Sequence, residues 1–173
     1  MQRIAAAAGY TAPTLYSYFR GKQAIVDALA DRMLREIERL FEVPLAEGLS
    51  LRQKLETLLR HQHAWVESRR ADFVFLVLRG GADEVSARHA AGVDVQQRHI
   101  ERLSGWLENE IEPGQLGAYS PSVAARSLSA LGNAYFLAWM SSGAIGSFSD
   151  QVPEILDLFF YGVSGPGDGA LAR

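Results

Sequence analysis

The side chains best suited to chemistry gather in the first 22 residues of this 173-residue chain. Arg3, Arg20 and Lys22 carry positive charge there and no acidic residue accompanies them, so the side-chain charge of this segment is +3. The whole chain has a net charge of −3, which leaves −6 for the other 151 residues. A basic segment on an acidic protein is the electrostatic footprint of a phosphate-binding face. The charge pattern therefore favours a nucleic acid as the partner of this segment.

The histidines and the remaining motifs offer no catalytic or metal-binding cluster. His61 and His63 are two residues apart, which puts them on nearly opposite faces of a helix, whereas metal-binding pairs on helices are four apart. His89 and His99 are isolated, and we expect each histidine to be a hydrogen-bonding group on the surface or in a pocket. Nucleophile elbows, phosphate-binding loops and zinc-peptidase motifs are absent from the sequence. We expect no catalytic residue, no metal, no cofactor and no enzymatic activity.

The composition is that of a globular protein. Hydrophobic residues make up 48% of the chain and charged residues 21%, and the length is enough to bury a sizeable core. The chain has no cysteine, which suits a reducing compartment. Its opening apolar run, residues 4–8, is too short and too weakly apolar for a signal peptide. We therefore expect a cytoplasmic protein.

Two short helices joined by a tight turn are predicted at the N-terminus. Residues 4–8 are an alanine-rich helical run, and Gly9 is placed to end it because glycine adopts the left-handed backbone of a helix C-cap. Thr11 is suited to cap the next helix, and Pro13 is tolerated in a first turn that needs no amide donor. This pattern is that of a helix-turn-helix, whose second helix enters the major groove of DNA.

The string IAAAAGYTAPTLYSYFRGK, residues 4–22, resembles the DNA-binding signature of the tetracycline-repressor (TetR/AcrR) family of bacterial transcriptional regulators. The motif covers residues 1 to about 41, and the rest of the chain agrees with the family only in length and all-helical pattern. The alternative is a helical hairpin in which Tyr16 and Tyr18 are ordinary amphipathic aromatics and Lys22 is a solvated charge. The basic segment speaks against that alternative.

The resemblance implies a role for each position of the motif. Leu15 and Phe19 are expected in the core. The expected base-facing residues are Ala12, Pro13 and Tyr16, of which the first two offer only apolar contacts, for instance to a thymine methyl. Phosphate contacts are expected at Thr14, Ser17, Tyr18 and Lys22. With the capping residue and the start of the preceding helix, the expected DNA-binding set is Gln2, Arg3, Thr11, Ala12, Pro13, Thr14, Tyr16, Ser17, Tyr18 and Lys22.

Further helices are predicted along the remaining chain, and no strand. Apolar residues at helical spacing and capping signals predict helices at 23–41, 51–70, 84–112, 122–142 and 153–163, and the apolar run at 73–78 is also taken as helical. The tail after residue 163 is expected to fray. The predicted fold is all-α, with a helix-turn-helix head and linker helix at 1–41 and a helical-bundle domain for ligand binding and dimerisation at 42–173.

The helical domain supplies material for a small-molecule pocket. Aromatic walls with a few polar anchors are typical of ligand sites, although for any one of these residues a place in the core or in a dimer interface is the better interpretation. The pocket hypothesis rests on the resemblance, in which the cavity lies among the helices after the linker helix and binds a small apolar effector. The expected ligand-binding residues are Trp65, Phe73, Trp106, Tyr135 and Trp139.

A homodimer is predicted through the helices at 122–142 and 153–163. The first is apolar on nearly every side, yet Arg126 and Asn133 make it a poor membrane span, so we expect burial on two sides and no membrane. In the resembled family the last two long helices form a four-helix bundle with their copies in a second subunit.

These observations predict a homodimeric regulator, most simply a repressor that leaves its double-stranded DNA operator when the effector binds. The alternative is a helical ligand-binding or dimerisation protein that has lost DNA binding through N-terminal truncation. The resembled family has a complete helix ahead of the motif, whereas here Met1 stands three residues before Ile4. Either further chain precedes Met1 or the head is incomplete, and we expect the chain as given to bind DNA poorly.

Overall fold

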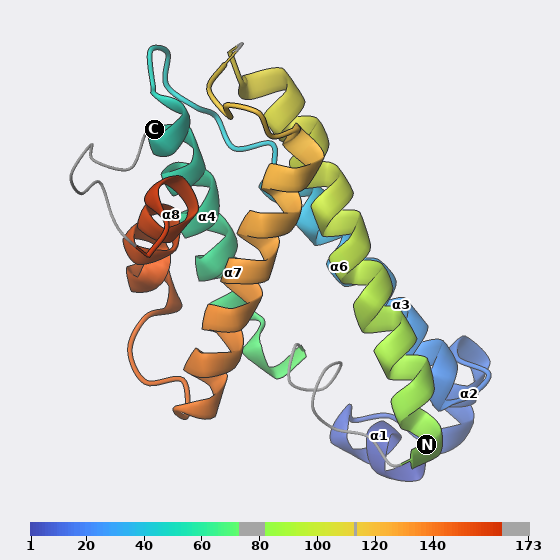
Figure 1. Cartoon of the computed structure of the whole chain (residues 1–173). Coiled ribbons are helices and arrows are strands. Elements are labelled where there is room, and N and C mark those ends of the chain that lie inside the picture. Colours follow the sequence, from blue (N-terminus) through green and yellow to red (C-terminus); the bar gives the residue numbers. More distant parts are fainter. Residues whose placement is uncertain (73–81, 113, 164–173) are drawn as a thin grey trace. The chain divides into compact units, whose positions relative to one another are not determined.

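All described elements of the structure, a computed structural model, are helical. It describes residues 1–72, 82–112 and 114–163, except the side chains of residues 82–94. No strand occurs among them, which confirms the all-α prediction; the predicted helix at 73–78 and the frayed tail lie outside the described residues. The elements are α1 (Gln2–Ala7), α2 (Ala12–Tyr18), α3 (Lys22–Leu40), α4 (Leu51–Ser68), α6 (Ala82–Glu110), α7 (Pro121–Ser141), a short 3-10 helix η1 (Phe148–Gln151) and α8 (Val152–Tyr161) (Figure 1).

Two helices begin at capping residues that the sequence identified. The Ser50 hydroxyl accepts a hydrogen bond from the Gln53 amide, and the Gln53 side chain accepts one from the Ser50 amide, so α4 opens with a capping box. The Ser120 hydroxyl accepts a hydrogen bond from the Val123 amide and caps α7, and Pro121 stands in its first turn. Local chemistry therefore sets where both helices start.

The chain forms two compact units, each made of two separate segments. The first unit holds residues 1–37 and 70–98, and the second holds residues 38–69 and 99–173. In the first unit, α1 packs against α2, and the Arg32 guanidinium bonds the Asp72 carboxylate at 2.8 Å. Arg32 Nε also lies 3.7 Å from a Glu36 carboxylate oxygen, one helical turn further along α3. The predicted domain boundary between residues 41 and 42 stays a prediction.

The second unit is built around the contacts of α8 with α4 and α7 (Figure 1). Its interior is aliphatic: Leu55 of α4 and Ile155 and Leu156 of α8 have no measurable exposure, and Leu128 of α7 has 2%. The Lys54 ammonium bonds the Glu110 carboxylate at 2.8 Å, which fastens α6 to α4. Burial of these side chains is the main favourable term for folding this unit.

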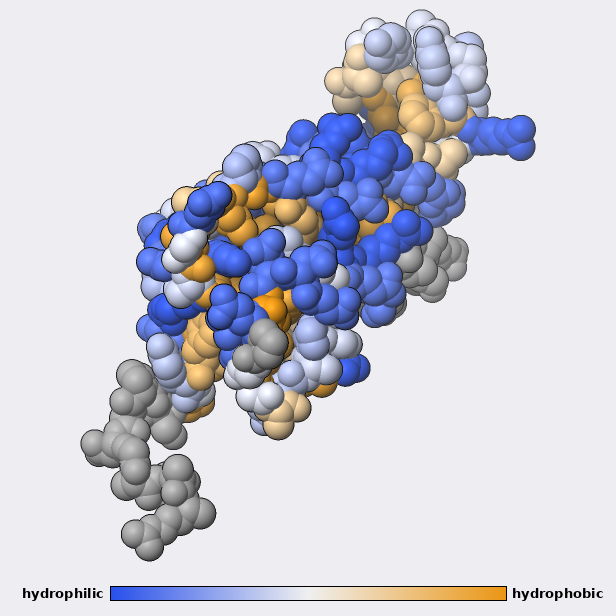
Figure 2. Space-filling view, turned by 90° about the horizontal axis from the view of Figure 1, so that it is seen from above, coloured by the Kyte–Doolittle hydropathy of each residue, from blue (hydrophilic) through white to orange (hydrophobic). Residues whose placement is uncertain are grey.

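Helix α7 is buried on one side only within this single chain. Ala124, Ala125, Leu128 and Trp139 are buried, whereas Leu137 on another face is 42% exposed. Figure 2 shows apolar patches interrupting a mostly hydrophilic surface on one face of the molecule. None of the described helices combines the length and the apolarity needed to cross a membrane. The outward side of α7, which carries Arg126 and Asn133 as well as Leu137, is therefore exposed in the single chain.

Candidate nucleic-acid interface

The turn between α1 and α2 is a complete Schellman motif. The Gly9 amide donates to the Ala6 carbonyl at 3.2 Å, and the Tyr10 amide donates to the Ala5 carbonyl at 2.9 Å. Gly9 holds φ at +73°, a left-handed conformation that a side chain disfavours. The turn thereby satisfies carbonyls that the end of α1 would otherwise leave open. This confirms the predicted role of Gly9 as the residue that ends α1.

Thr11 caps α2 through a local network of hydroxyl groups. Its Oγ1 accepts a hydrogen bond from the Thr14 amide at 3.3 Å and lies 2.8 Å from the Thr14 hydroxyl. The Ser17 hydroxyl donates to the Thr14 carbonyl at 2.7 Å. These bonds fix the direction in which α2 leaves the turn. A phosphate contact by Ser17 requires its hydroxyl to give up this internal acceptor.

The two short helices bury one face and expose the other. Ala5 of α1 is 1% exposed and Leu15 of α2 is 8% exposed, so these residues fill the space between the helices. Leu15 takes the core position expected of it, and Phe19 is half-buried. Tyr16 and Tyr18 are 55% and 77% exposed on the outside of α2. The outer face of α2 therefore presents aromatic rings and hydroxyl groups to a partner.

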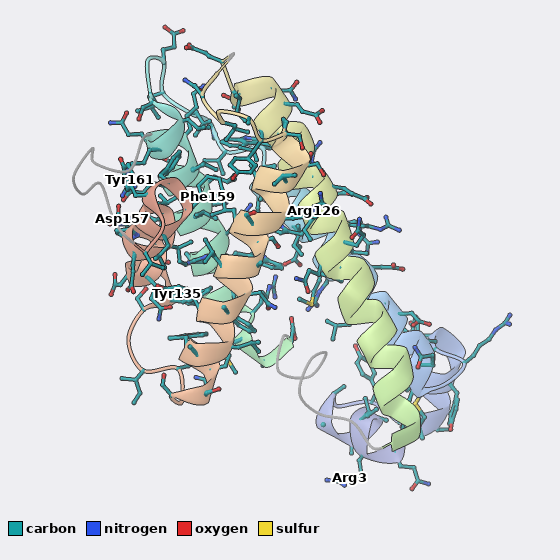
Figure 3. All side chains as sticks on the ribbon, viewed as in Figure 1. Arg3, Arg126, Tyr135, Asp157, Phe159 and Tyr161 are labelled. Atoms are coloured by element: carbon teal, nitrogen blue, oxygen red, sulfur yellow. The ribbon has the colours of Figure 1, made fainter. Side chains whose placement is uncertain are left out.

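Positive charge accompanies this exposed face. Arg3, Arg20 and Lys22 are all exposed, and Figure 3 shows Arg3 extending away from the ribbon of α1. The first acidic residue of the chain is Asp27, whose carboxylate accepts a hydrogen bond from the side-chain Nε2 of Gln23 at 2.7 Å. Cations on an exposed face attract phosphate, and a carboxylate beside them would weaken that attraction. No acidic residue occurs in residues 1–22, so the sequence places no carboxylate within this segment.

The structure gathers the predicted DNA-binding residues in α1, the turn, α2 and the first residue of α3. Gln2 and Arg3 lie in the first turn of α1, and the others follow along α2 up to Lys22. All are exposed except Ala12, which is half-buried. One continuous segment therefore carries the whole set, which we call the head, residues 1–22.

The predicted ligand-binding aromatics have different surroundings. Trp65 and Trp106 are half-buried, and Phe73 lies outside the described residues. Trp139 is buried, and its indole N–H donates to the Gly146 carbonyl at 3.1 Å. The Tyr135 hydroxyl donates to a Glu154 carboxylate oxygen at 2.7 Å, and burial together with that carboxylate raises the pKa of Tyr135 to about 12. Trp139 and Tyr135 thus hold the chain segments around α7 and α8 together.

A shallow hollow of about 270 Å³ lies at the connection between α6 and α7. Glu108 and Glu112 lie on one part of its wall, and Leu116 and Tyr119 on another. None of the described aromatics expected to bind a ligand lines it. The effector pocket therefore stays a prediction.

His63 and Phe148 form a buried aromatic contact that the sequence did not reveal. Their ring centroids are 3.9 Å apart and nearly parallel, and His63 Nδ1 lies 3.3 Å from the Phe148 carbonyl oxygen. Burial lowers the pKa of His63 to about 4, so the ring is neutral at pH 7. The carbonyl can only accept, so this neutral ring carries its proton on Nδ1. A signal existed, since His63 continues the apolar stripe of Leu55 and Leu59 at i+4.

Glu67 fastens η1 to α4. One of its carboxylate oxygens accepts hydrogen bonds from the Ser147 hydroxyl at 2.8 Å and from the Ser149 amide at 2.9 Å. Burial acts to raise the pKa of Glu67, but these hydrogen bonds outweigh it and the pKa is lowered. Nothing in the sequence pairs Glu67 with a loop 80 residues away, so pattern reasoning missed this contact.

Comparison with known families identifies the head. Among the described residues there is no group of three or more side chains able to hold a metal ion. No curated protein matches the chain significantly. The family model for bacterial regulatory proteins of the tetR family matches residues 1–29, which include α1, the Schellman turn and α2. The helix-turn-helix head of this chain is therefore similar to the DNA-binding segment of bacterial regulatory proteins of the tetR family.

Proposed function

We propose that this protein is a transcriptional repressor that binds an operator as a homodimer and leaves it when a small apolar effector occupies the helical domain. The observation that carries the proposal is the outer face of α2, where exposed tyrosines project from a capped helix beside three cations. The tetR-family match supports DNA binding and regulation of transcription.

Helix α2 has the properties of a recognition helix. Major-groove readers place the N-terminal residues of the second helix against base edges, and the first helix crosses the backbone. The capped first turn of α2 carries Ala12 and Pro13, which offer only apolar surface, so Tyr16 is the residue of the expected base-facing set whose side chain can hydrogen-bond a base edge. Tyr18 and Lys22 are suited to the flanking phosphates.

The open side of α7 supports the homodimer. Its exposed residues include small and apolar ones beside Arg126 and Asn133: Ala130 and Ala134 permit close approach, and Leu137 supplies bulk. A twofold contact needs a self-complementary patch, and a helix that packs against its own copy provides one. A dimer also places two heads on one duplex, so that each head contacts one half-site of the operator.

Fluorescence anisotropy with labelled DNA from beside the gene of this protein tests the proposal. The full chain is titrated into that DNA and into a scrambled duplex at one fixed salt concentration, and then at a series of salt concentrations. The variant Tyr16→Ala is compared with Tyr119→Ala, because Tyr119 is also an exposed tyrosine, at 70%, but lies outside the head.

Weak binding that still prefers the flanking DNA to the scrambled duplex is expected. Tyr16→Ala should weaken specific binding by roughly tenfold, equivalent to about 1.4 kcal/mol and within the range of a direct base contact. Tyr119→Ala should leave it unchanged, and both should keep the same weak, salt-dependent affinity for scrambled DNA. Equal loss in both variants, or no preference for the flanking DNA, would refute the proposed reading of bases by α2.

A further inference from the structure

A buried hydrogen-bond donor in α4 lacks an acceptor. Gln62 is 6% exposed, and its Nε2 atom has no hydrogen-bond partner among the described residues. Burying an unpaired amide costs roughly 1–3 kcal/mol, so native structures rarely retain one without a reason. The other two orphaned groups differ: Gln151 is only half-buried, and Arg52 bonds Asp157 through its second nitrogen at 2.7 Å. Gln62 is therefore the group that most needs an explanation.

The side of α4 that carries Gln62 is joined at one end to α6. Lys54, Leu58 and Gln62 recur every four residues and so share one side of α4. Lys54 bonds Glu110 of α6, and Leu58 is 1% exposed, so this side of α4 is buried from Leu58 to Gln62. Trp65, three residues beyond Gln62, is only half-buried. The unpaired amide thus lies beside aromatic surface that the core does not fully cover.

The interior around Gln62 is apolar and uncharged. Among the described residues, Gln62 and His63 are the buried polar side chains, and the rest of the buried set is hydrophobic. Burial lowers the pKa of both His63 and His99 to about 4, so neither ring is charged at pH 7. The charged groups close to His63 are Arg60, which bonds Glu56, and Glu67, which accepts hydrogen bonds from η1 and the residue before it. Because both charges are already paired or hydrogen-bonded, this interior favours an uncharged ligand.

We infer that the effector is an uncharged, largely aromatic molecule bearing a carbonyl oxygen, and that the Gln62 amide donates a hydrogen bond to that oxygen. A ketone, ester or lactone carbonyl is an acceptor without a donor of its own, which is what a lone N–H requires. The inference rests on the proposed effector-responsive function, because it assigns the chemistry of the same domain.

Satisfying a buried donor gives selectivity as well as affinity. A ligand that lacks the carbonyl leaves the Gln62 amide unpaired. Its affinity therefore falls by more than the loss of the oxygen's own contacts would cause. For a neutral hydrogen bond we expect about a tenfold preference for the carbonyl compound. Replacing Gln62 by methionine, which has similar length and no N–H, should remove the preference.

Matched ketone and methylene compounds test the inference on the full chain. The probes are 9-fluorenone with fluorene, benzophenone with diphenylmethane, and acetophenone with ethylbenzene. Binding is followed by thermal shift and by tryptophan fluorescence in the wild type, in Gln62→Met and in Gln96→Met, a control at an exposed glutamine of α6. The stability of each ligand-free variant is measured in the same series.

At least one ketone should bind about tenfold more tightly than its methylene partner to the wild type and to Gln96→Met. In Gln62→Met the ketone and its methylene partner should bind with equal affinity. Ligand-free Gln62→Met should be as stable as the wild type or more so, because an unpaired amide has been removed. Failure of every ketone to bind, a preference that persists in Gln62→Met, or a clear loss of ligand-free stability would overturn the inference.

The same preparations separate this inference from the proposed function. Operator binding is measured without ligand and then with the ketone that binds best. A ketone preference with no operator binding would refute the proposed function and keep the assignment of Gln62. Operator binding with no ketone preference would refute the assignment and keep the function.

Discussion

Substitution of Gly9 tests whether the turn holds the head in the geometry described. Gly9 has φ at +73°, and a Cβ atom built there would meet nothing within 4 Å. The cost of Gly9→Ala is therefore conformational rather than steric. A left-handed alanine costs roughly 1–2 kcal/mol, and restriction of the unfolded chain returns about 0.4–1 kcal/mol. The expected net loss is about 1 kcal/mol, a factor of about five in the local equilibrium.

Hydrogen exchange of the Tyr10 amide reports this loss directly, because that amide closes the turn on the Ala5 carbonyl at 2.9 Å. Its protection should fall about fivefold in Gly9→Ala and less in Gly9→Asn, since asparagine tolerates the left-handed region better. The control is Gly105→Ala inside α6, where φ is not positive and a Cβ also meets nothing. It should stabilise its own unit by about 0.5–1 kcal/mol. Unchanged Tyr10 protection in Gly9→Ala would refute the argument.

Three further predictions concern the helical domain. His63 has a pKa of about 4 when folded and 6.5 as its ordinary value, so the unfolded state binds more protons between these values. The free energy of unfolding should fall by up to roughly 3 kcal/mol as pH drops from 6.5 to 4, and His63→Phe should lessen this slope in urea titrations, leaving the part due to His99. Glu67→Leu leaves the Ser147 hydroxyl and the Ser149 amide without their acceptor and should cost about 1–2 kcal/mol in the same assay, whereas Ser68→Leu, on the exposed side of α4, should cost little. Leu137→Asp should halve the mass seen in sedimentation velocity, and an unchanged mass would exclude α7 from the interface.

Local chemistry made the helices and the head predictable. Each helix cap and turn is made by hydrogen bonds between residues at most five positions apart, so it is encoded where it occurs. The residues concerned are Gly9, Thr11, Ser50 and Ser120. The predicted helix bounds agree with the structure to within two residues, as expected where a capping residue sets the start. The head could likewise be predicted because its motif is continuous in sequence.

Long-range packing explains what the sequence did not predict. Glu67 meets Ser147 and Ser149 only because α4, α7 and η1 fold together, and η1 itself, residues 148–151, was not predicted. Trp139 was expected in a pocket. In the structure its indole N–H donates to the Gly146 carbonyl and its ring stacks on Phe148, and both partners follow α7 in the chain. Such contacts depend on tertiary structure, and no local pattern contains them.

Protection of DNA from hydroxyl-radical cleavage tests the central claim most directly. The duplex is the DNA beside the gene of this protein, and the full chain is added at fixed salt with and without 9-fluorenone. We predict two protected half-sites on one face of the duplex, about 10 base pairs apart, as two heads of a dimer would give. Tyr16→Ala should lose this pattern while Tyr119→Ala keeps it. Uniform protection that follows salt but not sequence, or none at all, would contradict operator recognition by α2.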